Sequence, residues 1–170
     1  GIITANSLEE IPDGARVIIR AHGVPPTDIT YLKKKGCTIL DATCPFVARI
    51  HKIVEEESEK GRAVLIFGKH GHPEVVGIAA RCKTPLIAET EEDLKEILQK
   101  HANSLLSVVC QTTFQKEICL KFVNIVKNTC NSPQIFDTIC VATELRQSEA
   151  HSLALRSDFA VVIGDPSSSN

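Results

Sequence analysis

Two short segments carry residue types that are common in catalytic and metal sites. His72-Pro73-Glu74 combines an imidazole, which can hold a phosphate or a metal ion, with a carboxylate able to transfer protons, at an expected helix start. Cys44 precedes Pro45, a favoured first helical residue, so we expect its sulfur at a helix N-terminus, where positive partial charge favours a thiolate. That environment suits a nucleophile or a metal ligand. For His72 and Glu74, a plain helix cap is the alternative.

Polar or cysteine-bearing turns follow one expected strand after another. They are residues 21–24, 41–45, 68–74, 111–113, 137–140 and 167–170. Ligands bind at the carboxyl ends of parallel strands in α/β folds, so these turns can face one cavity. The plain alternative is that Thr112 and Ser168 only cap helices and that His22 is a packed or surface residue.

The other cysteines do not form a recognisable site of their own. Five of them lie in or beside apolar runs and are interpreted as small core residues: Cys37, Cys82, Cys110, Cys119 and Cys130. The total of seven is odd and no CxxC pair occurs, which disfavours a disulfide framework, a zinc ribbon and a thioredoxin-like site. A reducing compartment fits best, and any metal site must be assembled from distant segments.

Short β-branched runs alternate with amphipathic stretches, which predicts an α/β fold with parallel strands joined by helices. We expect strands at 16–20, 38–40, 64–67, 86–88, 105–110, 134–136 and 159–163. We expect helices at 27–35, 45–60 and about 114–126, and a further one up to Lys100 behind a Thr90/Asp93 capping box. His51 lies at the edge of the apolar stripe of the second helix, which suits packing.

The composition excludes several classes of protein. In 170 residues, Lys plus Arg is 19 and Asp plus Glu is 21, a net charge of −2 that lacks the basic excess of a dedicated nucleic-acid binder. With 43% hydrophobic and 24% charged residues the chain is an ordinary globular mixture rather than a disordered one. No apolar run approaches the ~20 residues that span a bilayer, and no signal peptide is recognisable. We therefore expect neither a nucleic-acid nor a membrane partner.

Six motifs together resemble a known family. They are 21–24 (AHGV), 41–45 (DATCP), 71–75 (GHPEV), 111–113 (QTT), 139–143 (ICVAT) with Arg146-Gln147, and 168–170 (SSN). Their order and spacing are similar to those of 4-hydroxy-3-methylbut-2-enyl diphosphate reductases, from the first expected strand to the last residue. The resemblance implies the last step of the methylerythritol phosphate pathway, in which reductive dehydroxylation at a 4Fe-4S cluster gives isopentenyl and dimethylallyl diphosphate. It also implies a ferredoxin- or flavodoxin-type electron donor, and a bacterial cytoplasm or plastid stroma as the location.

The same resemblance implies a trefoil of three small parallel-sheet α/β domains around the cluster, each supplying one cysteine. Residues 1–44 match the later part of a first domain, 45–137 a complete second domain and 138–170 the start of a third, so we expect a fold truncated at both ends. Cys44 and Cys140 match two of the cluster ligands, and Glu74 and Thr112 match catalytic positions, Glu74 as the carboxylate of a proton relay. The matched substrate-binding positions are His22, His72, Thr112, Ser168, Ser169 and Asn170.

The departures from the family concern its outer segments. The third cysteine ligand and an early diphosphate-binding histidine belong to a segment before Gly1, and a further substrate-binding serine to one after Asn170. The chain also has no Met and begins with Gly, so we expect a piece of a longer protein that alone neither holds a stable cluster nor turns over substrate.

Two other classes of function stay open. One is a non-catalytic α/β module that binds a diphosphate or another anion through His22, His72, Thr112 and Ser168. The other is a Cys/His zinc protein, which the absence of paired cysteines makes the weakest candidate. The reductase interpretation requires Cys44 and Cys140 to approach a shared hollow that His72 and Glu74 also line.

Overall fold

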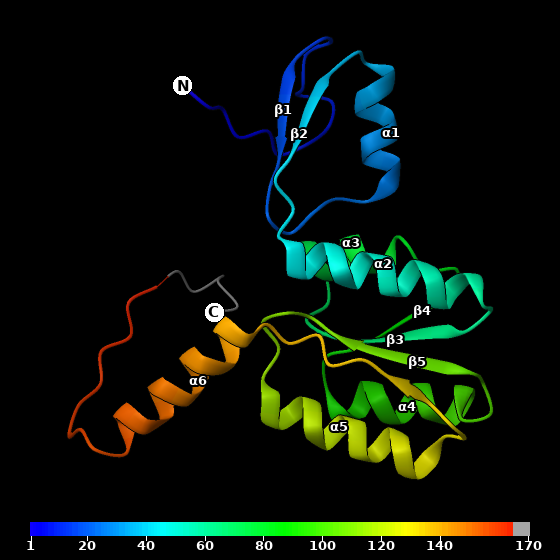
Figure 1. The fold of residues 1–170 in the computed structure, drawn as a ribbon, viewed down its shortest axis with the longest axis vertical. Coiled ribbons are helices and arrows are strands. Elements are labelled where there is room, and N and C mark those ends of the chain that lie inside the picture. Colours follow the sequence, from blue (N-terminus) through cyan, green and yellow to red (C-terminus); the bar gives the residue numbers. More distant parts are fainter. Residues whose placement is uncertain (165–170) are drawn as a thin grey trace.

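The computed structural model describes residues 1–164, which form two parallel β-sheets with helices beside them (Figure 1). The smaller sheet pairs β1 (Arg16–Ile19) with β2 (Thr38–Asp41), and α1 (Pro26–Lys34) connects the two strands. The larger sheet has the strand order β4-β3-β5-β6. Its strands are β3 (Ala63–Phe67), β4 (Pro85–Ala88), β5 (Leu106–Cys110) and β6 (Gln134–Ile135). The predicted α/β class with parallel sheets is confirmed.

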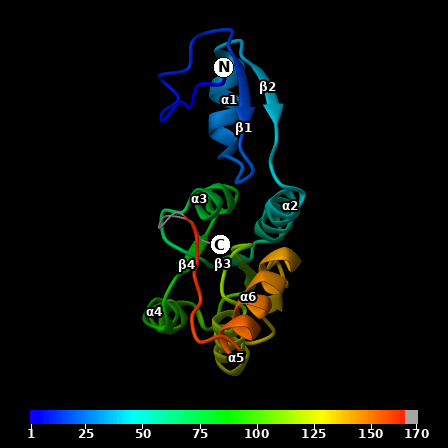
Figure 2. The ribbon, with the colours of Figure 1, turned by 90° about the vertical axis from the view of Figure 1, so that its left-hand side faces the viewer.

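Helices cover both faces of the larger sheet. On one face lie α2 (Pro45–Glu59) and α3 (Pro73–Ala79), and on the other α4 (Glu91–His101) and α5 (Lys116–Thr129) (Figure 1). Figure 2 shows the small sheet and α1 at one end of the molecule, next to α2 and α3. The last helix, α6 (Val141–Ala154), lies to the side of the larger sheet. The division into domains at 44/45 and 137/138 stays a prediction.

The core follows from the alternation of side chains along the central strands. In β3, Leu65 and Phe67 pack toward α4 and α5, whereas Val64 and Ile66 pack toward α2 and α3. Every residue of β3 and β5 is buried, as expected for parallel strands that are covered on both faces. Within residues 1–164, no helix combines the length and the apolar character that crossing a membrane requires.

Local sequence signals set the ends of the helices. Pro45 opens α2 directly after Cys44, and the helix ends at Glu59, two residues before Gly61, which has φ +77°. There the N–H of Arg62 donates to the carbonyl of Glu57, the long-range bond of a Schellman motif. The predicted capping box of α4 is confirmed, since Thr90 Oγ1 accepts from the N–H of Asp93 and Asp93 accepts in return from the N–H of Thr90.

Two expectations about the elements are wrong. Residues 159–163 form no strand, and they are highly exposed, with Phe159 and Ile163 more than nine-tenths accessible. A strand requires a partner for its backbone groups, and the structure pairs none of the described strands with this segment. Phe114 lies before α5 rather than inside it, because a residue of the preceding turn reaches the same apolar face and packs against Phe67 and Phe122.

The five cysteines interpreted as core residues divide into two groups. Cys110, Cys119 and Cys130 are buried, which confirms the interpretation for them. Cys37 and Cys82 are only half-buried. The thiol of Cys82 donates to the carbonyl of Ile78 at 3.4 Å, and burial raises the pKa of this thiol to about 12. Cys82 is therefore an uncharged thiol at neutral pH.

A buried ionic cluster joins α2 to the amino-terminal ends of β3 and β5. The carboxylate of Glu57 accepts from Ser107 Oγ at 2.6 Å and lies 3.3 Å from Arg62 Nε. Its side chain is 7% exposed and that of Arg62 is 12% exposed, so neither charge is well hydrated. Breaking a buried pair leaves the other charge uncompensated, which typically costs about 3–5 kcal/mol.

We expect Glu57→Ala to lower the free energy of unfolding by about 3 kcal/mol, measured by urea denaturation. The matched control is Glu56→Ala on the same helix, because Glu56 pairs with Lys52 at 3.8 Å on the surface and should cost less than about 1 kcal/mol. Equal small effects for both variants would contradict a stabilising role for the buried cluster.

Candidate active site at the carboxyl ends of the strands

The turns after β3 and β5 leave adjacent strands in opposite directions. Residues 68–72 lead from β3 to α3 on one face of the sheet, and residues 111–115 lead from β5 to α5 on the other face. Such a divergence opens a crevice beyond the carboxyl ends of the strands, where parallel α/β folds bind ligands. The motifs that contain His72, Glu74 and Thr112 lie at this place in the fold.

Glu74 and Thr112 form the closest contact of the site. The carboxylate of Glu74 accepts from the backbone N–H of Thr112 at 2.6 Å and from its hydroxyl at 2.7 Å. Both residues are buried, Glu74 being 2% exposed. Burial raises the pKa of the Glu74 carboxyl, and the two hydrogen bonds from Thr112 oppose that rise. Thr112 does not cap α5, whose N-cap is Gln115, so its hydroxyl serves the carboxylate instead.

His72 connects Glu74 to His22, which lies in the turn after β1. His72 is the N-cap of α3, and its Nδ1 accepts from the N–H of Glu74 at 3.2 Å. Its ring meets that of His22 edge to face, with 5.3 Å between the centroids. Burial lowers the pKa of His72, and the nearby His22 and Lys69 lower it further. His22 Nδ1 is buried and has no hydrogen-bond partner among residues 1–164. An unpaired buried nitrogen of this kind points to a ligand or a bridging water.

The two candidate metal ligands both lie at helix N-termini. Cys44 is the N-cap of α2 and Cys140 is the N-cap of α6, as the position of Pro45 predicts for Cys44. The N–H of Cys44 donates to the carbonyl of Ala21, next to His22, at 3.0 Å. The N–H of Cys140 donates to the carbonyl of Thr112, also at 3.0 Å. Each cysteine is thus tied by its backbone to one of the turns that carry His22 or Thr112.

A continuous series of contacts therefore joins five of the six motifs. In order, it passes through Cys44, Ala21, His22, His72, Glu74, Thr112 and Cys140. The remaining candidates, Ser168, Ser169 and Asn170, lie outside the described residues. Among the residues that are described, the structure contains no group of three or more His, Cys, Asp or Glu side chains placed to hold a metal ion.

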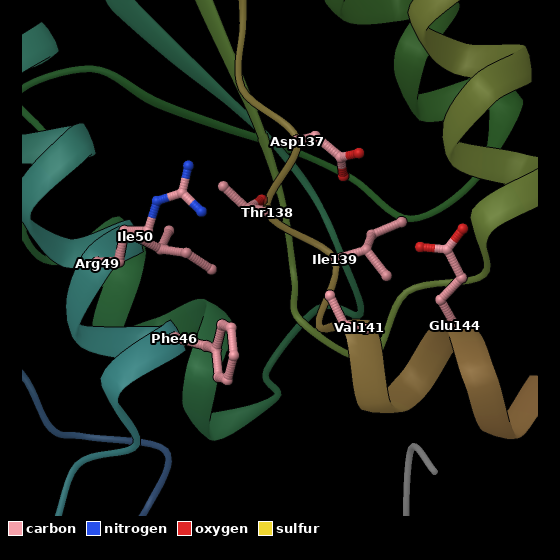
Figure 3. A pocket seen from close by; sticks show the side chains of 8 residues that line it. All are labelled: Phe46, Arg49, Ile50, Asp137, Thr138, Ile139, Val141 and Glu144. Atoms are coloured by element: carbon pink, nitrogen blue, oxygen red, sulfur yellow. The ribbon is translucent and has the colours of Figure 1, made fainter.

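A cavity of about 170 Å³ lies between α2 and the start of α6 (Figure 3). Phe46, Arg49 and Ile50 line it from α2, and Val141 and Glu144 from α6. The connection from β6 to α6 completes the lining with residues 137–139. Its walls include neighbours of Cys44 and Cys140 but not the two cysteines, so it is a hollow beside the candidate site and not the shared one expected from the sequence.

Gln111 is a site residue to which the sequence alone assigns no role. Its side-chain oxygen accepts from the N–H of Lys69 at 3.0 Å, and its amide donates to Thr113 Oγ1 at 2.9 Å. The adjacent Gly68 is packed so closely that a Cβ there would lie 2.6 Å from Val75 Cγ2 and 3.0 Å from Gln111. Gln111 thereby braces the turn that carries His72. In the sequence, only its position between a buried strand and two threonines could have indicated that Gln111 supports this turn.

The burial of His51 predicts that the stability of the chain depends on pH. It is 7% exposed on α2, and burial, together with the charge of Arg81, lowers its pKa to about 4, against an ordinary value of 6.5. As the pH falls from about 6.5 to about 4, the unfolded chain takes up this proton first, so the contribution of neutral His51 to stability is lost over that interval. The loss should reach about 3 kcal/mol.

The free energy of unfolding should decrease between pH 6.5 and pH 4, in part because His51 is protonated. We expect His51→Gln to remove the part of this decrease that His51 causes, measured by urea denaturation at several pH values. His151→Gln, at an exposed position on α6, is the control and should leave the decrease unchanged. If the two variants follow the same pH dependence, buried His51 is not its source.

Comparisons with known proteins agree with the motifs. A family model described as LytB protein matches residues 1–170. The 4-hydroxy-3-methylbut-2-enyl diphosphate reductase of Campylobacter hominis is 37% identical over 170 residues, which is all of this chain and 61% of the relative. That of Helicobacter pylori strain P12 is 37% identical over 162 residues, 95% of this chain and 58% of the relative. A Clostridium tetani protein of the same name is 38% identical over 165 residues, covering 96% of the chain but only 25% of the relative.

Solved structures give the same result. The chain superimposes on the E-1-hydroxy-2-methyl-but-2-enyl-4-diphosphate reductase from Plasmodium falciparum with a TM-score of 0.92 and 31% identity, over 99% of this chain and 54% of that one. A second structure, of (E)-4-hydroxy-3-methyl-but-2-enyl diphosphate reductase, gives a TM-score of 0.75 and 36% identity, over 94% of this chain and 57% of that one. The chain thus spans about a quarter to three fifths of the length of these relatives. Since the family model matches it from end to end, the chain belongs to the LytB family.

Proposed function

We propose that this chain forms the central part of a 4-hydroxy-3-methylbut-2-enyl diphosphate reductase. The observation that carries the proposal is the series of contacts from Cys44 through His22, His72, Glu74 and Thr112 to Cys140. The series links two possible cluster ligands, two imidazoles and a buried carboxyl through successive contacts, which supports the proposal. The overall reaction takes two electrons and two protons, breaks the allylic C–O bond, and releases water and isopentenyl or dimethylallyl diphosphate.

The two cysteines fit a 4Fe-4S cluster in part. Each is half-buried and is the N-cap of a helix, Cys44 of α2 and Cys140 of α6. Cys44 and Cys140 would be two of its ligands, and the described residues contain no group of three or more His, Cys, Asp or Glu side chains that could hold a metal ion. When bound, such a cluster supplies electrons and an iron that can act as a Lewis acid. We therefore propose that stable binding requires a further ligand from a segment outside residues 1–164.

Glu74 and Thr112 supply a proton in this proposal. A buried carboxyl whose pKa is raised keeps its proton closer to neutral pH than an exposed one, which suits a general acid. The Thr112 hydroxyl, 2.7 Å from the carboxylate, orients it and can pass a proton between Glu74 and the departing hydroxyl group of the substrate. The backbone N–H of Thr112 holds the same carboxylate and limits its movement.

His22 and His72 bind the diphosphate in this proposal. Their rings are in contact, and the Nδ1 of His22, which has no partner among residues 1–164, can donate to an anionic oxygen or accept from a bridging water. Neutral or protonated imidazoles and hydroxyl groups can hold a diphosphate without many basic side chains, which agrees with the net charge of −2. Ser168, Ser169 and Asn170 stay proposed members of the same site.

The experiment compares two proteins prepared without oxygen: the 170-residue chain, and the product of its native reading frame with every segment that the frame encodes. After reconstitution with iron and sulfide, we measure bound iron, visible absorbance and reduction of 4-hydroxy-3-methylbut-2-enyl diphosphate by a chemical reductant. We expect a longer product to bind the cluster and turn over substrate, and the 170-residue chain to do neither. Near-stoichiometric cluster and turnover in the chain alone would overturn the need for further segments.

The same measurements separate the alternatives. Pyrophosphate binding that Cys44→Ala leaves unchanged, in a protein that binds no iron, would favour an anion-binding module. Bound zinc without visible absorbance would favour a zinc protein. A ferredoxin- or flavodoxin-type protein as electron donor, and a bacterial cytoplasm or plastid stroma as location, belong to the reductase proposal. Replacement of the chemical reductant by a reduced ferredoxin tests the donor.

A further inference from the structure

Two side chains that the proposed mechanism does not use pack against the turn that carries His22. They are His51, in the middle of α2, and Arg81, just after the end of α3. His51 is 7% exposed, and its Nε2 is buried without a hydrogen-bond partner among the described residues. A buried unpaired nitrogen loses its hydration without a hydrogen bond in return, a cost that an aliphatic side chain at this position would avoid. The position of the ring therefore needs an explanation beyond filling the core.

The first contact is with Gly23, directly after His22. Gly23 has φ +70°, in the left-handed region that favours glycine, and is buried. A Cβ on Gly23 would lie only 2.6 Å from His51 Cε1 and 3.5 Å from His51 Nε2. The edge of the imidazole thus lies directly against the backbone of the turn. The turn cannot move toward α2 while this ring is in place.

The second set of contacts comes from α3. A Cβ on Gly77 would lie 3.5 Å from His51 Nε2, 3.6 Å from the carbonyl oxygen of His22 and 3.9 Å from Arg81 Nη1. Arg81 Nη1 donates to the carbonyl of Val24 at 3.0 Å, and Arg81 Nε pairs with Glu55 of α2 at 3.1 Å. The turn is therefore held from α2 by His51 and from α3 by Arg81.

We propose that His51 is a positioning residue: together with Arg81 it fixes the backbone of residues 22–24 and so holds the His22 ring against His72. This inference rests on the proposed diphosphate-binding role of His22. His22 follows β1 of the small sheet and His72 follows β3 of the larger one, so their 5.3 Å contact depends on how the turn after β1 packs against α2 and α3. His51 acts on the substrate only through His22.

The test measures binding of inorganic pyrophosphate by titration calorimetry, and separately the kcat and KM of substrate reduction, in the product of the native reading frame. The variants are His51→Ala, His22→Ala and the double variant. The control is Val54→Ala, on the same helix as His51, whose side chain is fully buried against the sheet core. This substitution leaves a cavity and should lower stability by a similar amount. Val54 is not among the residues nearest to Gly23, so the contact of the turn with α2 stays intact.

We expect His51→Ala to weaken pyrophosphate binding about 10-fold and to raise KM more than it lowers kcat. In the His22→Ala background the same substitution should have no further effect on pyrophosphate binding, because residues that act through one another are not additive. Val54→Ala should leave pyrophosphate binding unchanged in both backgrounds. A merely structural role for His51 would give equal effects with and without His22.

Several outcomes would overturn the inference. Unchanged pyrophosphate binding in His51→Ala would overturn it and leave the role of His22 intact. It would also be overturned if His51→Ala weakened binding equally with and without His22, or if Val54→Ala weakened binding as much as His51→Ala does. Failure of wild-type protein to bind pyrophosphate, or normal binding in His22→Ala, would remove the diphosphate site and the inference with it. If wild-type protein binds pyrophosphate as described but reduces no substrate, the reductase proposal alone fails.

Discussion

Replacement of Glu74 by Gln is expected to lower kcat for reduction of 4-hydroxy-3-methylbut-2-enyl diphosphate at least about 100-fold, since general acid catalysis typically contributes 100- to 10,000-fold. The amide has the same shape and can still accept from the backbone N–H of Thr112, so the fold and KM should change little. It cannot deliver the proton that the raised pKa of the buried carboxyl keeps available. The measurement is steady-state kinetics in the reconstituted product of the native reading frame.

Thr112 provides the matched controls for this prediction. The hydroxyl of Thr112 lowers the pKa of Glu74, so its loss in Thr112→Val should raise that pKa further. If protonated Glu74 is the acid, activity falls as the pH rises through its pKa. Thr112→Val also removes the hydroxyl proposed to pass the proton, so it should lower kcat, and the decline of its remaining activity should move to higher pH. Thr112→Ser keeps the hydroxyl and should retain the wild-type profile. Wild-type activity in Glu74→Gln would rule out the proton-relay role.

The sequence predicts the local structure well because its signals are local. The apolar stripe of α2, the Pro45 helix start and the Thr90/Asp93 capping box each act within one or two turns, and the structure contains all three. The strand predicted at residues 159–163 is wrong because strand formation depends on contacts that are distant in the sequence. A β-branched run becomes a strand only beside a partner strand, and the described residues offer it none.

The site was predictable as a set of residues but not as an arrangement. The rule that ligands bind at the carboxyl ends of parallel strands groups His72 with Thr112, because their turns follow β3 and β5. The rule does not show that the Thr112 hydroxyl binds Glu74 rather than capping a helix. Nor does the spacing along the chain show that His51 touches Gly23, since that contact depends on how the small sheet meets α2.

Cys44→Ser and Cys140→Ser are expected to abolish cluster binding in the product of the native reading frame. Even residues behind a metal ligand change affinity by about 10- to 100-fold when mutated, so loss of a ligand should cost at least as much. Serine keeps the size of the side chain and the N-cap position at α2 or α6, but its hydroxyl is a poor ligand for iron. Bound iron and visible absorbance after anaerobic reconstitution are the measurements.

The controls are Cys37→Ser and Cys82→Ser, which alter half-buried thiols away from the helix N-termini. Cys82 bonds to the carbonyl of Ile78 and stays protonated because its pKa is about 12, so it makes a poor ligand. Both controls should keep wild-type iron content, and urea denaturation should show that all four variants fold. Full iron content in Cys44→Ser, or equal losses in Cys37→Ser, would show that the cluster is held by other residues. Cys44 and Cys140 are the two ends of the series of contacts. Loss of iron in both variants would therefore indicate that both cysteines are ligands of the cluster.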